Sequence, residues 1–437
     1  MAATGLLVFL LVLLLMVLGI PVAFAFLAAN MLGALLIMGG VSGLLQLVDN
    51  STSLITSFTL VAVPMFVLMG ALLFHSGLAL RVFDTLDALF GRLPARLSYL
   101  TVAGGATFST LTGSTLANTA MLGSLMVPEM SRRGYATHMS VGPIIGTGGL
   151  AMLIPPSALG VLLGSLARID IGALLVAGLL PGILLALMYC SVIAVQAKLD
   201  PASAPAYAPE DNVRLTAMRR LALIVTNILP LGLVIFCVVG FIILGIATPS
   251  EAAAFGALSV AALAAFNRCL TLTAIRKSLL ATVEVTGMVF LLVISSSVFG
   301  QLMAFAGSST VLIDWSTGIT ALPLVKLLAM FAVLLLLGMF MDQISIMLLT
   351  IPVFFPLAAS LGYDPVWFGI VVLLAMEMSL STPPFGLLLF VMQGVAPAGT
   401  SFADIAKAAV PYLLCDLGLV ALLVMFPGLA LFLPGLI

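Results

Sequence analysis

Charged residues are scarce in this sequence: 15 lysines and arginines and 16 aspartates and glutamates make up 7% of its 437 residues. Soluble globular proteins carry about 25% charged residues. Hydrophobic residues account for 63% of the chain, and no polar linker divides it into soluble units. A chain this apolar cannot cover a water-facing surface, which excludes a soluble fold and predicts a membrane protein.

Cysteine is also rare, and several catalytic motifs are missing. The four cysteines form no CxxC pair and lie in or beside apolar runs, which is typical of small buried hydrophobic residues rather than of disulfides or metal ligands. No GxxxxGK[ST], HExxH or GxSxG motif occurs, so nothing predicts P-loop ATP binding or a zinc or serine hydrolase. We expect neither an ATP cofactor nor an enzyme.

Apolar segments recur along the whole chain, and a spanning helix needs about 20 such residues. The first lacks the basic region and cleavage site of a signal peptide, so we interpret it as a retained membrane segment. Mixed stretches at 42–56, 80–97 and 269–280 predict amphipathic helices on the bilayer surface. Several apolar segments are too long for one crossing and are interrupted by Gly and Pro, which is tolerated only beside protein or a water-filled cavity.

Three motifs recur at one constant spacing and indicate a duplicated unit. They are Pro128 with Pro356, Gly134-Tyr135 with Gly362-Tyr363, and Pro155-Pro156 with Pro383-Pro384. The alternative is a coincidence of common residues. Five arginines surround the first block (81, 92, 96, 132 and 133), whereas the second has only Lys326. Cytoplasmic loops are enriched in Lys and Arg, so we predict that the two copies have inverted topology.

Threading the chain this way puts 13 basic residues inside and only Arg168 and Lys326 outside. We divide the all-α polytopic chain into four regions. They are N-terminal membrane segments with an interfacial helix at 1–60, a first inverted repeat at 61–197 with a re-entrant hairpin at 101–130, a connecting loop with scaffold helices at 198–280, and a second inverted repeat at 281–437 with a hairpin at 326–363.

The hairpin tips and the Pro-Pro breaks carry the predicted chemistry. Half-helices that meet at a tip present free N–H groups, carbonyls and dipoles, which suit anionic substrates and small cations. Consecutive prolines break a helix and free the carbonyls upstream. The candidate Na⁺ ligands are Thr112, Gly113, Ser114, Asn118, Thr147, Gly148, Gly338, Asp342, Ser345 and Thr382, and the candidate substrate-binding residues are Ser114, Thr115, Pro155, Pro156, Glu377, Pro383 and Pro384.

Each of these assignments has a structural alternative. Small residues at the tip also allow close helix packing, and a Pro-Pro pair can be a simple kink. Asp342 and Glu377 are carboxylates in apolar surroundings, which indicates a functional role. Asp342 could instead cap its half-helix, and Glu377 could be a structural hydrogen-bond anchor. Glu251, after the Thr248-Pro249 turn, is interpreted as a charge at a helix N-terminus.

Five ordered blocks resemble the large membrane subunit of TRAP (tripartite ATP-independent periplasmic) transporters of the DctM-like family. The blocks are GSTLANTAMLGSLMVPEMSRRGY, LIPPSALGVLLG with IGALLVAGLLPG, LGIATPSEAAAFGAL, GMFMDQISIMLLTIPVFFPLAASLGYDPVWFGIV and STPPFGLLLFV. The resemblance covers nearly the whole chain. This sequence departs from the family at Asn118 and Gln343, where small or hydroxylated residues are more familiar.

The resemblance implies a multi-pass permease of the bacterial inner membrane that uses a Na⁺ gradient and an elevator-type movement. It also implies two partners, a small four-helix membrane subunit (DctQ-like) and a periplasmic substrate-binding protein (DctP-like). The expected substrate is a small organic anion of the C4-dicarboxylate, keto acid or sialic acid type. The alternatives are a stand-alone Na⁺/anion symporter of related architecture and a scaffold or receptor subunit that transports nothing.

Overall fold

The computed structural model describes residues 2–90, 93–112, 115–155, 157–205, 217–307, 322–384, 386–397 and 399–436. Within these ranges the chain is helical, without a strand, as the sequence predicted. Six of the described helices are long and apolar enough to span a membrane, and the bent pair α8 (Thr137–Leu153) and α9 (Ala158–Ala167) would make a seventh. The architecture is therefore that of an all-α, multi-pass membrane protein.

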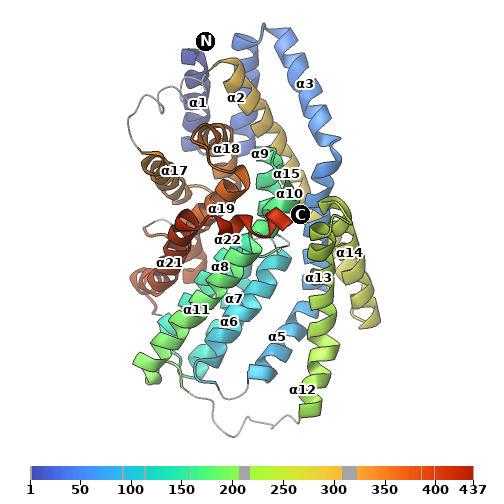
Figure 1. The fold of residues 1–437 in the computed structure, drawn as a ribbon, viewed down its shortest axis with the longest axis vertical. Helices are drawn as coiled ribbons and strands as arrows, with labels where there is room; N and C mark the ends of the chain where they lie inside the picture. The colour runs from blue at the N-terminus through green and yellow to red at the C-terminus, as the bar shows by residue number, and fades with distance from the viewer. Residues whose placement is uncertain are drawn as a thin grey trace.

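A first helix group extends from α13 and α14, on the right in Figure 1, to α1, α2 and α3 near the N-terminus at the top. It contains α1 (Ala2–Val17), α2 (Val22–Ile37), α3 (Val41–Ile55), α4 (Ala62–His75), α13 (Leu229–Ile243), α14 (Pro249–Phe266) and α15 (Leu272–Phe305). Helix α4 packs on both α14 and α15, and α15 packs on α2 and α3. Apolar side chains such as Phe236 (73% exposed) cover its outer surface, as expected for a surface that faces lipid.

The second helix group holds both predicted hairpins and both Pro-Pro breaks. It contains α6 (Arg96–Thr112), α7 (Thr115–Arg132), α8, α9, α10 (Ile171–Ala177), α11 (Leu179–Leu199), α17 (Pro323–Gly338), α18 (Gln343–Ser360), α19 (Pro365–Ser381), α20 (Leu387–Val395), α21 (Phe402–Met425) and α22 (Gly428–Leu431). Helix α8 contacts α6, α7, α11, α19 and α21. Helices α8 and α19 have no continuous polar face and nearly all of their residues are buried, so they lie in the centre of this group.

The helix bounds repeat at the spacing of the paired motifs. Helices α7 and α18 are offset by this same spacing at both ends (115 and 343, 132 and 360), and so are α8 and α19 (137 and 365, 153 and 381). The contacts between the halves are reciprocal, because α9 packs on α18 while α20 packs on α7. Equivalent segments of the two halves therefore have equivalent neighbours.

Local capping explains where several helices begin. The Thr248 hydroxyl accepts a hydrogen bond from the Glu251 N–H (3.4 Å), and Glu251 Oε2 accepts one from the Thr248 N–H (2.8 Å). This reciprocal cap starts α14 at Pro249 and confirms the interpretation of Glu251 as a helix N-terminal charge. The stretch 42–56 lies largely in α3.

One predicted surface helix is absent as a separate element. The sequence predicts a helix on the bilayer surface at 269–280, but Thr271 caps a 34-residue helix, α15, that begins at Leu272. The prediction of a separate helix there is wrong. No proline interrupts the run from Leu272 to Phe305, so the helix that begins in the mixed stretch continues through the apolar one.

Candidate functional site

The buried Glu377 carboxylate lies where the two predicted hairpin tips meet. Glu377 is on α19 and only 2% exposed. Its Oε2 accepts hydrogen bonds from the Thr115 hydroxyl (3.1 Å) and from Gln343 Nε2 (3.2 Å). Thr115 is the first residue of α7 and Gln343 is the first residue of α18. Residues at equivalent positions of the two repeats thus bind the same carboxylate oxygen.

Helix α8 approaches the other oxygen of Glu377 closely. A Cβ atom added to Gly148 would lie 2.2 Å from Glu377 Oε1 and 2.5 Å from Thr115 Cγ2, and one added to Gly149 would lie 3.4 Å from Glu377 Cγ. Only glycine fits such an approach. Among the described residues, Glu377 Oε1 has no hydrogen-bond partner. Burying an unpaired carboxylate oxygen is costly, so this position favours a cation or a proton.

A second buried carboxylate lies behind the first. Asp416 on α21 is 4% exposed and accepts a hydrogen bond from the Tyr189 hydroxyl on α11. That hydroxyl would lie 3.1 Å from a Cβ added to Gly149, which also borders Glu377. The Tyr189 ring packs edge-on against Tyr412, with centroids 5.3 Å apart. The site is therefore acidic in its interior, with Tyr189 bonded to one carboxylate and Gly149 packed against the other.

A cavity of about 560 Å³ lies in front of the tips, between the two helix groups. Its lining from the second group comes from α7, α9, α18 and the end of α19, and includes Gln343 and Ser345. The first group contributes apolar residues of α2, α4 and α15, such as Val67 and Met288. A largely apolar cavity with a few polar groups at one end is typical of a site for a small organic molecule.

Comparison with known proteins identifies the family of this chain. A family described as "Tripartite ATP-independent periplasmic transporter, DctM component" matches residues 9–429. The chain belongs to this family. The C4-dicarboxylate TRAP transporter large permease protein DctM of Pseudomonas aeruginosa is 33% identical over 381 residues, with 86% of each chain covered.

A second relative supports the membership of this DctM-family chain, and a solved structure shares its fold. The sialic acid TRAP transporter large permease protein SiaM of Vibrio cholerae is 31% identical over 421 residues, which cover 96% of this chain and 95% of that protein. The crystal structure of the Alcanivorax borkumensis YdaH transporter superposes with a TM-score of 0.63 at 16% identity and covers 89% of each chain. At 16% identity, the similarity to the YdaH structure shows only that the two proteins share a fold.

The permease has few described side chains at the first tip. Gly113 and Ser114 lie outside the described residues, and only the backbone of Thr112, which ends α6, is described. Asn118 is fully buried in the first turns of α7. The role of these residues as Na⁺ ligands stays a prediction.

At the second tip the structural alternative for Asp342 is observed. Its carboxylate is exposed and accepts hydrogen bonds from the N–H groups of Ile344 (3.1 Å) and Ser345 (3.2 Å) and from the Ser345 hydroxyl. Asp342 therefore caps α18. Gly338 ends α17, where an added Cβ would lie 1.7 Å from Ser379 Oγ. At Gly338, as at Gly148, the small residue allows close helix packing.

Both Pro-Pro segments separate two helices, as predicted. Pro155 lies between α8 and α9, Pro383 and Pro384 lie between α19 and α20, and Pro156 lies outside the described residues. At the first break, the Leu153 carbonyl packs closely against Gly178. A Cβ added to Gly178 would lie 2.2 Å from the Leu153 oxygen.

The hydroxyls of both broken helices bond within their own segments. The Thr147 hydroxyl donates to the Ile144 carbonyl (2.8 Å) and the Thr382 hydroxyl donates to the Met378 carbonyl (2.5 Å). The Thr382 hydroxyl oxygen still has lone pairs with which to accept or to coordinate. The assignment of both threonines as ion ligands stays a prediction.

Sequence reasoning missed Asp416, Tyr189 and the role of Gln343. Asp416 carries the same signal as Glu377, a carboxylate inside an apolar run. In the sequence, Gln343 stands out only as a departure from the family pattern. The repeat spacing could have revealed its role, because Gln343 occupies the position of the second repeat that corresponds to Thr115 at the first tip.

Proposed function

We propose that this chain is the large permease subunit of a Na⁺-coupled TRAP transporter that imports a small organic anion. The observation that carries the proposal is the meeting of Thr115 and Gln343, from equivalent tips, at the buried Glu377 beside a cavity of about 560 Å³. A polar pocket formed by interrupted helices from two repeats is the usual construction of substrate and ion sites in secondary transporters.

The coupling ion binds at the tips and breaks that surround Glu377. Na⁺ is a hard cation that prefers oxygen ligands, and unwound carbonyls and helix ends supply them. The side chains of Asn118 and Ser345 are buried there, and the Gly148 backbone borders the carboxylate oxygen that has no hydrogen-bond partner in the described part of the chain. The negative charge of Glu377 would favour a cation at this position.

The substrate occupies the cavity between the two helix groups. The tip residues Gln343 and Ser345 face it from one side, and apolar residues such as Val67 and Met288 face it from the other. We infer that α6–α7 and α17–α18 are re-entrant hairpins of inverted repeats. The second helix group then moves as an elevator against the first and carries the substrate across the bacterial inner membrane.

Two partners complete the proposed transporter, a small DctQ-like membrane subunit of four helices and a DctP-like periplasmic binding protein. The binding protein delivers a C4-dicarboxylate, a keto acid or a sialic acid. Relatives named for C4-dicarboxylates and for sialic acid support this substrate class.

The proposal is tested by uptake into liposomes that contain the large and small subunits. Labelled succinate, pyruvate and N-acetylneuraminate are supplied with and without the cognate binding protein, under an inward gradient of Na⁺ or of K⁺. We expect uptake of one anion only when Na⁺ and the binding protein are both present. Uptake that needs Na⁺ but no binding protein would favour the stand-alone symporter, and no uptake of any anion would favour the scaffold subunit.

Asn118→Ala tests the ion assignment separately. It removes a buried amide oxygen from α7, so we expect the Na⁺ concentration at half-maximal uptake to rise about tenfold, by the loss of one ligand of roughly 1.4 kcal/mol. Asn227→Ala is the matched control, because Asn227 donates to Thr85 (2.8 Å) in a different part of the molecule. An identical Na⁺ dependence in both variants would reject Asn118 as a ligand.

A further inference from the structure

A second polar space lies between the helix groups, separate from the Glu377 site. Two cavities of about 500 and 460 Å³ are both lined by Arg168, Ile169 and Gln301. Because they share these residues, we treat them as one space and name it the Arg168 vestibule. None of its lining residues borders the cavity at the tips.

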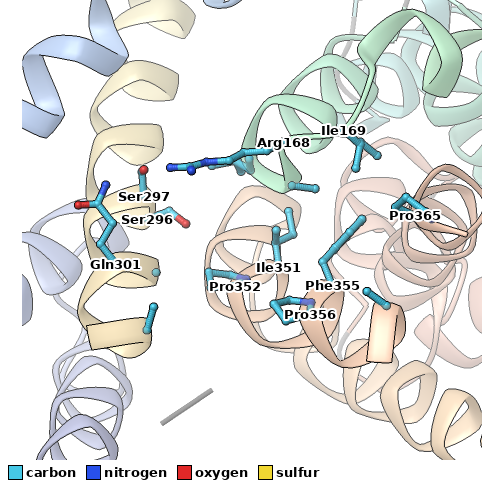
Figure 2. A pocket seen from close by; sticks show the side chains of 15 residues that line it. Arg168, Ile169, Ser296, Ser297, Gln301, Ile351, Pro352, Phe355, Pro356 and Pro365 are labelled. Atoms are coloured by element: carbon cyan, nitrogen blue, oxygen red, sulfur yellow. The ribbon is translucent and has the colours of Figure 1, made fainter. Parts of the chain in front are cut away.

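The vestibule is rich in hydrogen-bond donors. Arg168 extends from the end of α9 toward Ser297 and Gln301 on α15, with α18 on the other side (Figure 2). Gln301 Oε1 accepts a hydrogen bond from Asn50 Nδ2 (2.5 Å), which leaves its Nε2 as a donor. Ser53, Ser57 and Ser165 add hydroxyl groups, and among the described residues no Asp or Glu lines either cavity.

Arg168 faces this space, and no described acidic side chain pairs with it. Within the described ranges its guanidinium forms no ion pair or hydrogen bond. The acidic residue closest in sequence, Asp170, instead caps α10 by accepting the Ala173 N–H (2.7 Å). Arg168 ends α9 in the left-handed conformation (φ 55°), where glycine or asparagine is usual and a long side chain is rare.

The position of this charge in the sequence fits an outward-facing role. Arg168 is one of only two basic residues that the predicted inverted topology puts outside. A cleft lined by one sign of charge attracts ions of the opposite sign. The guanidinium fork also matches a carboxylate with two parallel hydrogen bonds.

We propose that the Arg168 vestibule is an anion-binding site, in which the carboxylate of the substrate pairs with Arg168 before the substrate reaches the tips. This inference rests on the proposed function, because it takes the substrate to be an organic anion that arrives from outside. Gln301 Nε2 supplies a further donor. The same charge chemistry would suit the phosphate of an anionic lipid, and the experiments separate the two sources.

Charge-selective labelling tests the site independently of transport. Ser297→Cys is introduced after Cys190, Cys237, Cys269 and Cys415 are replaced by serine, and the large and small subunits are reconstituted in phosphatidylcholine liposomes. An anionic methanethiosulfonate should react with the new thiol about tenfold faster, relative to a cationic one, than in the Arg168→Asn variant, from one charge at contact range in a watery cleft. Asparagine tolerates the left-handed backbone, and Arg168→Lys should keep the ratio.

The occupant is identified by protection. Succinate or N-acetylneuraminate at millimolar concentration should slow the anionic reagent at least threefold when Arg168 is present, and should not do so in Arg168→Asn. If neither anion protects but addition of phosphatidylglycerol does, the site holds a lipid and the proposal is overturned. An equal reagent ratio with and without Arg168 also overturns it, because the guanidinium then sets no local field.

Uptake by the complete transporter supplies the functional readout. Arg168→Asn should lower the initial rate of anion uptake at least tenfold and leave the Na⁺ dependence unchanged, whereas Arg168→Lys should retain most of the rate. If the wild type takes up the anion and Arg168→Asn does so at the same rate, the proposed anion site in the Arg168 vestibule is refuted and the proposed function is not. Absence of uptake in the wild type refutes the proposed function, while the labelling ratio still reports on the charge of the vestibule.

Discussion

Replacing Gly148 by alanine tests the close approach of α8 to the Glu377 carboxylate. The added Cβ would lie 2.2 Å from Glu377 Oε1 and 2.5 Å from Thr115 Cγ2. Cβ contacts shorter than 3.0 Å essentially never occur, so the carboxylate or the α7 tip must move by roughly 1 Å. Overpacking of this kind costs about 1–3 kcal/mol.

The movement also disrupts the hydrogen bonds that hold the tips. Glu377 Oε2 accepts from Thr115 and Gln343 at 3.1 and 3.2 Å, and a shift of about 1 Å stretches at least one of them beyond a hydrogen-bond distance. Since a loss of about 1.4 kcal/mol corresponds to a factor of ten in rate, we expect the initial rate of Na⁺-driven uptake to fall at least tenfold.

The assay compares initial uptake into liposomes with the thermal unfolding midpoint of the purified protein. Gly240→Ala is the matched control, because Gly240 is also within a helix and an added Cβ meets nothing within 4 Å. The control should retain uptake within about twofold, since alanine favours a helix by only about 1 kcal/mol. Uptake by Gly148→Ala within twofold of wild type would refute the inferred contact and the arrangement built on it.

Three further substitutions test separate parts of the structure. Glu377→Gln keeps a hydrogen-bond acceptor but removes the negative charge, so the Na⁺ concentration at half-maximal uptake should rise at least tenfold; an unchanged Na⁺ titration would exclude the carboxylate from ion binding. Tyr189→Phe leaves buried Asp416 without its donor, which should destabilise the protein by about 1–3 kcal/mol, and an unaltered thermal midpoint would contradict this. Thr248→Ala removes the cap of α14 and should cost about 1 kcal/mol, whereas Thr52→Ala, whose exposed hydroxyl bonds only within its own helix, should leave the midpoint unchanged.

Much of the fold could be predicted because its causes are local in sequence. Long apolar runs predict helices in lipid, and the Pro-Pro pairs mark where α8 and α19 end, since proline cannot continue a helix from its interior. The constant spacing between the paired motifs reappears in the bounds of α7 and α18. The surface helix expected at 269–280 was wrong because the cap at Thr271 starts a helix that no proline interrupts.

By itself, therefore, the sequence determined the membrane environment, the breaks and the repeated helix pattern. Only the tertiary structure decided which polar groups meet. Glu377 is 262 residues from Thr115, and Asp416 is 227 residues from Tyr189, so no local pattern could pair them. Packing of α7 and α19 against α8 brings the first pair together, and glycine at 148 makes room for the carboxylate. That Asp342 caps α18 needed the structure for the same reason, because a cap depends on which N–H groups its carboxylate faces in the folded chain, and its assignment as an ion ligand stays a prediction.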